Sequence, residues 1–267
     1  MPEWTDGYVE ANGLRFFYTR TGGRKPPLVL AHGHSDNGLC WTRVTKALQA
    51  DYDLIMYDAR RHGLSEDGPE GEERPPASGA HDAAGIIQAL GLDKPGMMGH
   101  SMGAATAAAT AALYPELLKY IILEDVPWFD AESLARWGRR RGAQPPESQP
   151  KTREQWVAQI RARHPNWHED EIGPWADAKV QYHKRDWSGR WPQPPPWQQV
   201  AAKITIPTLL ITADPEAGSI VTPAVAQEAL ALMPKAQVAH IAGAGHSIHR
   251  DRFDAFMEAV GSFLAEV

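Results

Sequence analysis

Short, continuous apolar runs alternate along most of the chain with longer stretches whose apolar residues recur at helical spacing. A continuous apolar run predicts a strand that is buried on both faces, as in the centre of a parallel sheet. Asn12-Gly13 predicts a hairpin turn between the first two strands, and Gly91 is placed to end a helix. The predicted strands are 8–10, 14–19, 27–31, 52–57, 96–98, 120–123, 207–212 and 237–241, and the main helices between them are 39–50, 79–90, 104–113, 223–233 and 252–264.

This alternation predicts the fold class. Strands that alternate with helices form a parallel sheet in which each helix crosses over one face. We therefore expect an α/β protein with a mostly parallel, eight-stranded sheet flanked by helices.

The alternation is interrupted once. Residues 127–197 contain eight of the ten tryptophans and ten of the 22 prolines, and they show no strand pattern. Helical spacing returns at 152–162 and 169–182, and the proline-rich stretch 191–197 predicts a stiff, extended link back to the sheet. We expect a core made of residues 1–126 and 198–267, with 127–197 inserted as a helical, Trp- and Pro-rich cap.

Composition and charge exclude several classes of partner. A formal net charge of −6 argues against nucleic acid, because phosphate binding needs clustered positive charge. No stretch approaches the roughly 20 apolar residues of a membrane span, and the N-terminus has no signal-peptide pattern. The one cysteine, Cys40, excludes an intrachain disulfide and suits a reducing compartment. We expect a cytoplasmic protein without a nucleic-acid or membrane partner.

The candidate chemistry begins at the pentapeptide Gly99-His100-Ser101-Met102-Gly103, which lies between a predicted strand and a predicted helix. A strand that runs into a helix through two glycines makes a sharp turn, and the residue at its apex is strained and exposed above the sheet. Ser101 at this apex is therefore the candidate nucleophile.

A serine hydroxyl needs a base, and the base needs an orienting acid. The predicted base is His246, in the loop after the last strand, and the predicted acid is Asp214, at the end of strand 207–212. All three residues follow strands at the same edge of the sheet, where side chains from separate strands converge. Asp125, which follows the strand 120–123, is the leading alternative acid, and Glu216 is a third candidate.

With these motifs in place, the chain resembles the α/β-hydrolase superfamily over nearly its whole length, as a lid-containing serine esterase or lactonase. The residues that carry the resemblance are His32-Gly33, Asp58-Ala-Arg-Arg-His-Gly-Leu-Ser65, Gly-His-Ser-Met-Gly at 99–103, Ala213-Asp214-Pro215 and Gly245-His246. They occur in the family's order, Ser…Asp…His. The family usually has glycine where Arg61 stands, a departure that affects this loop and leaves the triad intact.

The resemblance implies a hydrolase that needs no cofactor and cleaves carboxylic esters or lactones through an acyl-enzyme on Ser101. It also implies an oxyanion hole formed by the backbone N–H groups of His34 and Met102. The side chains of His34 and Trp128 are candidates to line a fairly apolar pocket for a small-molecule substrate. The family motifs account for His32, His34, His100 and His246, so we predict no metal site.

Two other hypotheses stay open. The same triad supports carbon–carbon bond hydrolysis, amide hydrolysis or perhydrolysis, because these reactions share the serine, the histidine and the oxyanion hole. A ligand receptor built on a hydrolase scaffold is the alternative from another class.

Overall fold

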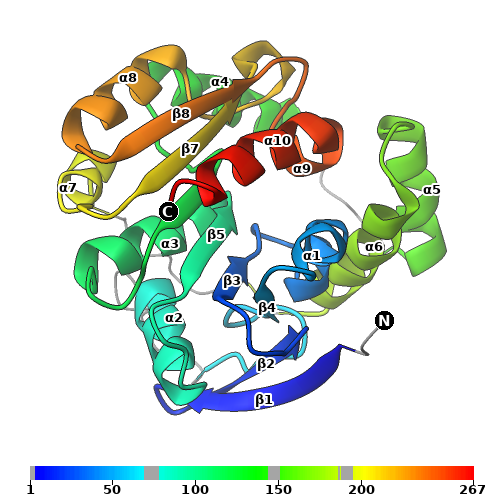
Figure 1. The fold of residues 1–267 in the computed structure, drawn as a ribbon. Coiled ribbons are helices and arrows are strands. Elements are labelled where there is room, and N and C mark those ends of the chain that lie inside the picture. Colours follow the sequence, from blue (N-terminus) through cyan, green and yellow to red (C-terminus); the bar gives the residue numbers. More distant parts are fainter. Residues whose placement is uncertain (1–3, 69–77, 144–150, 186, 188–194) are drawn as a thin grey trace.

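In the computed structural model, residues 4–68, 78–143, 151–185, 187 and 195–267 are described, with the backbone alone for 140–143. An eight-stranded sheet in the order β1-β2-β4-β3-β5-β6-β7-β8 forms the centre (Figure 1). The strands are β1 (Thr5–Ala11), β2 (Leu14–Arg20), β3 (Pro27–Ala31), β4 (Asp53–Tyr57), β5 (Gly96–His100), β6 (Ile121–Glu124), β7 (Thr208–Ala213) and β8 (Ala236–Ile241).

The strand directions confirm the prediction of a mostly parallel sheet. The strand pairs β1–β2 and β2–β4 are antiparallel, and the strands from β4 to β8 are parallel to one another. The predicted hairpin turn is present, because Asn12 and Gly13 have φ angles of 51° and 74° and join paired Ala11 and Leu14. Two consecutive residues with positive φ match the twist of a tight hairpin.

Helices cover both faces of the sheet (Figure 1). Their bounds are η1 (Gly38–Trp41), α1 (Thr42–Leu48), α2 (Ser78–Ala89), α3 (Met102–Leu113), α4 (Ala131–Ala143), α5 (Arg153–Arg163), α6 (Glu169–His183), α7 (Trp197–Ala201), η2 (Pro215–Ala217), α8 (Pro223–Leu232), α9 (Ile248–Asp251) and α10 (Phe253–Leu264). Gly91 follows α2 with φ of 62°, the left-handed conformation that ends a helix at low steric cost.

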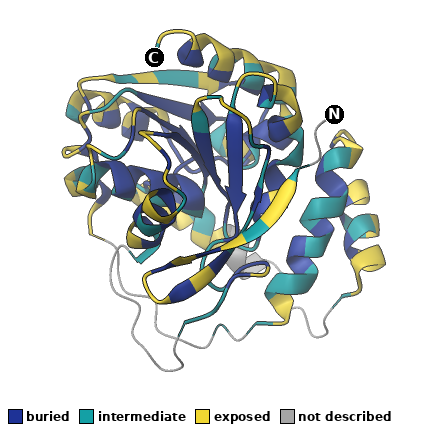
Figure 2. Ribbon diagram, turned by 60° about the horizontal axis from the view of Figure 1, so that its bottom comes forward, coloured by how far each residue is buried: buried dark blue, intermediate teal, exposed yellow. Residues whose placement is uncertain are grey.

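Two apolar cores lie on opposite faces of the sheet. Along β3, Val29 and Ala31 contribute to the core that contains α2, α3, α7 and α8 residues, whereas Leu28 and Leu30 contribute to the core of α1 and α10 residues. Successive side chains of a strand point to opposite faces, so an unbroken apolar run serves both cores. Figure 2 shows the result, with buried central strands and helices exposed on their outer sides.

The chain between β6 and β7 contains α4, α5 and α6. The predicted helices at 152–162 and 169–182 are confirmed as α5 and α6, whereas α4 was not predicted. Thr152 begins α5 with a capping box to Gln155, which satisfies two backbone N–H groups at the helix start. The pair α5–α6 packs against itself, and α6 also packs against η1 and α1, while Figure 1 places α4 apart from this pair. Most of the predicted proline-rich link, residues 191–194, lies outside the described residues.

The loop after β4 contains the departure at Arg61. Arg61 adopts φ of 64°, a conformation that glycine enters freely and other residues enter at a cost of about 1–2 kcal/mol. The loop keeps its shape because the buried carboxylate of Asp58 accepts hydrogen bonds from Gly38 N and Leu64 N, both at 2.7 Å. The two hydrogen bonds to Asp58 therefore hold the loop after β4 and offset the strain at Arg61.

Candidate active site

Ser101 lies at the apex of the turn from β5 into α3. Its φ and ψ angles are 52° and −115°, a strained conformation for a residue with a side chain. The glycines on either side are required by close approach, because a Cβ on Gly99 would collide with the Gly103 carbonyl and one on Gly103 with the Ala31 carbonyl. This local geometry is the predicted one, and Ser101 is half-buried at the end of the sheet.

His246 lies in the loop between β8 and α9 and faces Ser101. Its Nε2 is 3.0 Å from Ser101 Oγ, and its Nδ1 is 2.6 Å from Asp125 Oδ2. A carboxylate can only accept, so Nδ1 carries the proton and Nε2 is left to accept from the serine hydroxyl. The imidazole therefore has the tautomer that a general base for Ser101 requires.

Asp125 directly follows β6 and is fully buried. Its carboxylate accepts hydrogen bonds from Ser219 Oγ at 2.7 Å, from Ile220 N at 2.9 Å and from Val221 N at 3.1 Å, in addition to His246. Several donors from one loop fix the direction of the carboxylate. Asp125 thus presents one oxygen to the imidazole while the loop before α8 holds the other.

The predicted pairing of His246 with Asp214 is wrong, and Asp125 takes its place. Asp214 Oδ1 is 3.2 Å from His240 Nε2, and its Oδ2 accepts from Gly243 N at 2.7 Å. The strand order explains the correction, because β6 pairs directly with β5, the strand that leads to Ser101, whereas β7 lies one strand farther away. Asp214 instead shapes the loop that leads to His246. The third candidate, Glu216, lies in η2.

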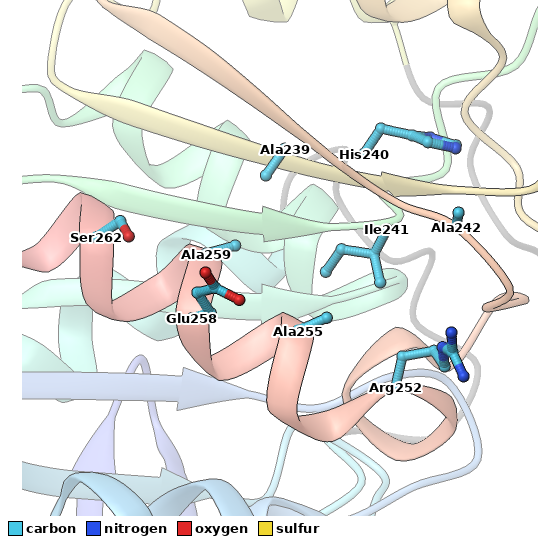
Figure 3. A pocket seen from close by; sticks show the side chains of 9 residues that line it. All are labelled: Ala239, His240, Ile241, Ala242, Arg252, Ala255, Glu258, Ala259 and Ser262. Atoms are coloured by element: carbon cyan, nitrogen blue, oxygen red, sulfur yellow. The ribbon is translucent and has the colours of Figure 1, made fainter.

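A groove between β8 and α10 contains the partner of Asp214. It has a volume of about 390 Å³ and is lined by Ala239, His240, Ile241, Ala242, Arg252, Ala255, Glu258, Ala259 and Ser262 (Figure 3). Ser101, Asp125 and His246 are not among these residues. Asp214 therefore belongs with a different surface from the Ser101–His246 pair.

The two predicted oxyanion donors follow the neighbouring strands β3 and β5, at the sheet edge where Ser101 lies. Met102 is the first residue of α3, and His34 follows β3, the strand that pairs with β5. The His34 side chain lies in an aromatic cluster, with its Nε2 2.6 Å from Tyr182 Oη and its ring 5.3 Å from that of Trp187. This arrangement puts His34 between the sheet edge and α6.

The candidate pocket residue Trp128 is packed in the interior of the protein. Its side chain is only 3% exposed and stacks on Trp197, with ring centroids 5.1 Å apart, inside one of the two apolar cores. Trp137 on α4 lies against the catalytic candidate instead, with its ring edge-on to His246 at 5.0 Å. Trp137 was not among the predicted site residues, because no helix was predicted over Ala131–Ala143.

His100, the second residue of the pentapeptide, forms a hydrogen bond with the backbone of His246. Its Nε2 donates to the His246 backbone carbonyl at 2.8 Å. Burial lowers the pKa of the His100 imidazole to about 3, so the ring is neutral at physiological pH. A Cβ on Gly33 would lie 2.7 Å from His100 Nδ1, which explains the glycine beside it. His100 therefore holds the His246 loop without adding charge to the site.

No group of three or more His, Cys, Asp or Glu side chains in the described ranges could hold a metal ion. Within the same ranges, no helix is long and apolar enough to cross a membrane.

Comparison with known proteins gives the family and the fold. A sequence model described as the alpha/beta hydrolase family matches residues 28–259. The chain is 30% identical over 273 residues to N-formylmaleamate deformylase of Pseudomonas putida, covering 97% of this chain and 96% of that protein. It is 28% identical to esterase YbfF of Escherichia coli, over 89% and 92% of the two chains. The crystal structure of E-2-(acetamidomethylene)succinate hydrolase superposes with a TM-score of 0.77 at 22% identity, covering 98% of this chain and all of the other.

Proposed function

The chain belongs to the alpha/beta hydrolase family, and from this premise we propose that it cleaves carboxylic esters or lactones through an acyl-enzyme on Ser101. The observation that carries the proposal is the continuous hydrogen-bonded row Ser101–His246–Asp125, with distances of 3.0 and 2.6 Å. A nucleophile, a base and an orienting acid at these separations are the parts that acyl transfer needs.

In the proposed reaction, Ser101 Oγ attacks the substrate carbonyl while its proton passes to His246 Nε2. Asp125 holds the opposite ring nitrogen and stabilises the imidazolium that forms. The backbone N–H groups of His34 and Met102 receive the negative charge on the carbonyl oxygen. The imidazolium then gives its proton to the leaving alcohol, and water, activated by the same histidine, hydrolyses the acyl-enzyme.

The segment 127–197 is proposed as the cap over this site. Trp137 of α4 lies edge-on to His246, and Tyr182 of α6 contacts His34, so two helices of the segment reach residues of the proposed machinery. Aromatic side chains beside a nucleophile favour a substrate with an apolar part. The proposed substrate is therefore a small molecule with an apolar acyl or alcohol group.

Amide hydrolysis is the second candidate. It is favoured by the deformylase relative, which is 30% identical over 97% of this chain, whereas the esterase relative is 28% identical over 89%. N-formyl and N-acyl amides need the same serine, base and oxyanion donors, but the leaving group is a nitrogen that must be protonated. The triad geometry is compatible with either leaving group.

The first experiment is labelling with a fluorophosphonate, followed by intact mass spectrometry of wild type and Ser101→Ala. One adduct on wild type and none on the variant is the result expected of an activated serine. A wild-type protein without an adduct would contradict the proposed function and favour the receptor hypothesis.

The second experiment separates the two candidate reactions. Wild type is assayed on a series of p-nitrophenyl esters and lactones and, in parallel, on N-formyl and N-acetyl amides of small carboxylic acids. A kcat/KM at least about 100-fold higher for the best ester supports ester cleavage, since that difference is roughly 2.7 kcal/mol of transition-state stabilisation. The reverse ratio moves the assignment to amides.

A further inference from the structure

Residues 34–37 form a short loop between β3 and η1, here called the oxyanion loop because it begins with the proposed donor His34. The loop turns sharply, with Ser35 at φ of 66° and the Asp36 N–H bonded to the Gly33 carbonyl at 3.1 Å. A non-glycine residue in this conformation is kept there only when its surroundings hold it. The contacts of the loop therefore decide where the His34 N–H points.

One stretch of α6 contacts every residue of the oxyanion loop. Lys179 Nζ lies 2.9 Å from Ser35 O, 2.8 Å from Ser35 Oγ and 2.7 Å from Asp36 Oδ1. Gln181 Oε1 accepts from Asn37 Nδ2 at 2.8 Å. Tyr182 Oη is 2.6 Å from His34 Nε2. Three side chains within four positions of one helix thus bond to four consecutive residues of the loop.

Lys179, at the centre of these contacts, directs its ammonium group at the oxyanion loop. Lys179 is 9% exposed and Asp36 is 4% exposed, so the ion pair between them is largely removed from water. An ammonium group has three N–H donors, and each of the three has an oxygen of the loop within hydrogen-bond distance. Such a buried cation is retained only where all of its donors are satisfied.

A second cation completes the arrangement from the core. Arg250 of α9 contacts the other carboxylate oxygen of Asp36 at 2.9 Å and is itself 3% exposed. Burial alone raises the pKa of Asp36, but Arg250 and Lys179 together hold it well below its usual range. The carboxylate thus stays charged between one cation from the core and one from α6.

Within the described residues, two other ion pairs join α6 to the core, and one of them, between Glu171 and Arg250 at 3.5 Å, is buried. Lys46 of α1 pairs with Asp170 at the start of α6, and these side chains are 45% and 29% exposed. An exposed pair of this type contributes little to stability. The buried, fully satisfied contacts of α6 described above are directed at the oxyanion loop.

We propose that Lys179 and Tyr182 are positioning residues, which fix the oxyanion loop so that the His34 N–H meets the charge that develops during attack by Ser101. The inference rests on the proposed function and deepens it, because it makes α6 part of the reaction machinery rather than only a cover. Stabilisation by such a donor depends steeply on its placement, and a displacement of about 1 Å can cost roughly 100-fold in rate.

The test measures the second-order rate constant for fluorophosphonate labelling of Ser101 in wild type, Lys179→Met, Tyr182→Phe and Lys46→Met. The phosphonyl oxygen occupies the oxyanion site, so the rate reports the donors without a known substrate. We expect a fall of about 10- to 100-fold for Lys179→Met. For Tyr182→Phe we expect about threefold to tenfold, the worth of one hydrogen bond. Lys46→Met, which removes the exposed pair, should stay within about twofold of wild type.

A second readout separates positioning from general loosening of α6. With the best ester, kcat should fall in Lys179→Met while KM changes little, because the lost interaction is made mainly in the transition state. Hydrogen exchange at residues 34–37 should rise in Lys179→Met and not in Lys46→Met.

The outcomes are distinguishable. Wild-type rates in a folded Lys179→Met, or an equal loss in Lys46→Met, would overturn the inference and leave the proposed function intact. If Lys179→Met does not fold, Tyr182→Phe decides, and an unchanged rate there overturns it. A wild-type protein that is not labelled at all removes the proposed function, and the inference with it.

Discussion

Asp125 Oδ2 lies 2.6 Å from Nδ1 of His246, although 121 positions separate the two residues in the chain. The side chain of Asp125 is wholly buried and that of His246 is 24% exposed, so the bond joins a fixed acid to a ring that faces the site. Its consequence is a tautomer of His246 that leaves Nε2 free of a proton beside Ser101.

Replacing each aspartate in turn should show whether Asp125 or Asp214 is the acid that acts on His246. Asp125→Asn should lower kcat by about 10,000-fold. An amide at this position favours the wrong tautomer of His246, and it has no negative charge with which to stabilise the imidazolium. Asp214→Asn should keep kcat within about twofold, since Asp214 bonds to His240 and Gly243 and not to His246. Steady-state kinetics on one ester, with circular dichroism to verify folding, compares the pair. A large loss in Asp214→Asn with an active Asp125→Asn would restore the family's usual acid position.

Two tryptophans provide a matched test of the site and the core. Trp137→Leu should lower kcat/KM by about threefold to tenfold, because it removes the aromatic contact that borders His246, and should leave the fold stable. Trp128→Leu should destabilise the protein by about 2–4 kcal/mol, since its ring is buried and stacked on Trp197. Urea unfolding and kcat/KM are measured for both variants. If Trp128→Leu changed only KM, Trp128 would be a pocket residue after all.

The glycine after Ser101 should not tolerate even a methyl group. Gly103→Ala places a Cβ against the Ala31 carbonyl, so the turn must move and the free energy of unfolding should drop by about 3 kcal/mol or more. Gly261→Ala in α10 is the control, because no atom lies within 4 Å of its added Cβ and a helix gains about 0.5–1 kcal/mol from the change. Chemical denaturation of both variants measures the change in the free energy of unfolding, which should be negative for Gly103→Ala and positive for Gly261→Ala. Equal stabilities would mean that the turn adapts easily.

Acid should destabilise the protein from about pH 6.5 downward, before most carboxylates titrate. Burial lowers the pKa of His100 from its ordinary value of 6.5 to about 3, so between these pH values the unfolded chain binds a proton that the folded protein does not bind. Stability is therefore present above pH 6.5 and is lost as the pH falls toward 3. The buried residues His32, His62 and His249 act in the same direction, whereas the raised pKa values of the buried residues Asp58, Glu124 and Glu171 act in the opposite one.

His100→Gln isolates one contribution to this pH dependence, because glutamine can still donate to the His246 carbonyl but cannot titrate. Between pH 7.5 and 5.0 the variant should lose about 2 kcal/mol less stability than wild type, as expected for one histidine over 1.5 pH units. The exposed His81→Gln serves as the control. An identical pH dependence in His100→Gln and wild type would mean that His100 titrates normally in the folded state.

The sequence by itself determined the strands of the sheet and the sharp turn at Ser101, because both depend on residues that are close together in the chain. The apolar runs at 27–31 and 120–123 are typical of buried strands, and the two glycines around Ser101 favour a tight strand-to-helix turn. The position of His246 beside Ser101 was also predictable, since the carboxyl ends of parallel strands share one edge of the sheet.

The tertiary structure alone decided which carboxylate forms a hydrogen bond with His246 and which residues the helices between β6 and β7 contact. Asp125 and Asp214 both follow parallel strands, and only the order of β5, β6 and β7 in the sheet makes Asp125 the neighbour of His246. Ser35 and Lys179 are 144 positions apart, so no local pattern could pair them. The strength of a hydrogen bond depends on the donor–acceptor distance to within tenths of an ångström. Groups that are far apart in the chain reach this distance only when the whole protein has folded.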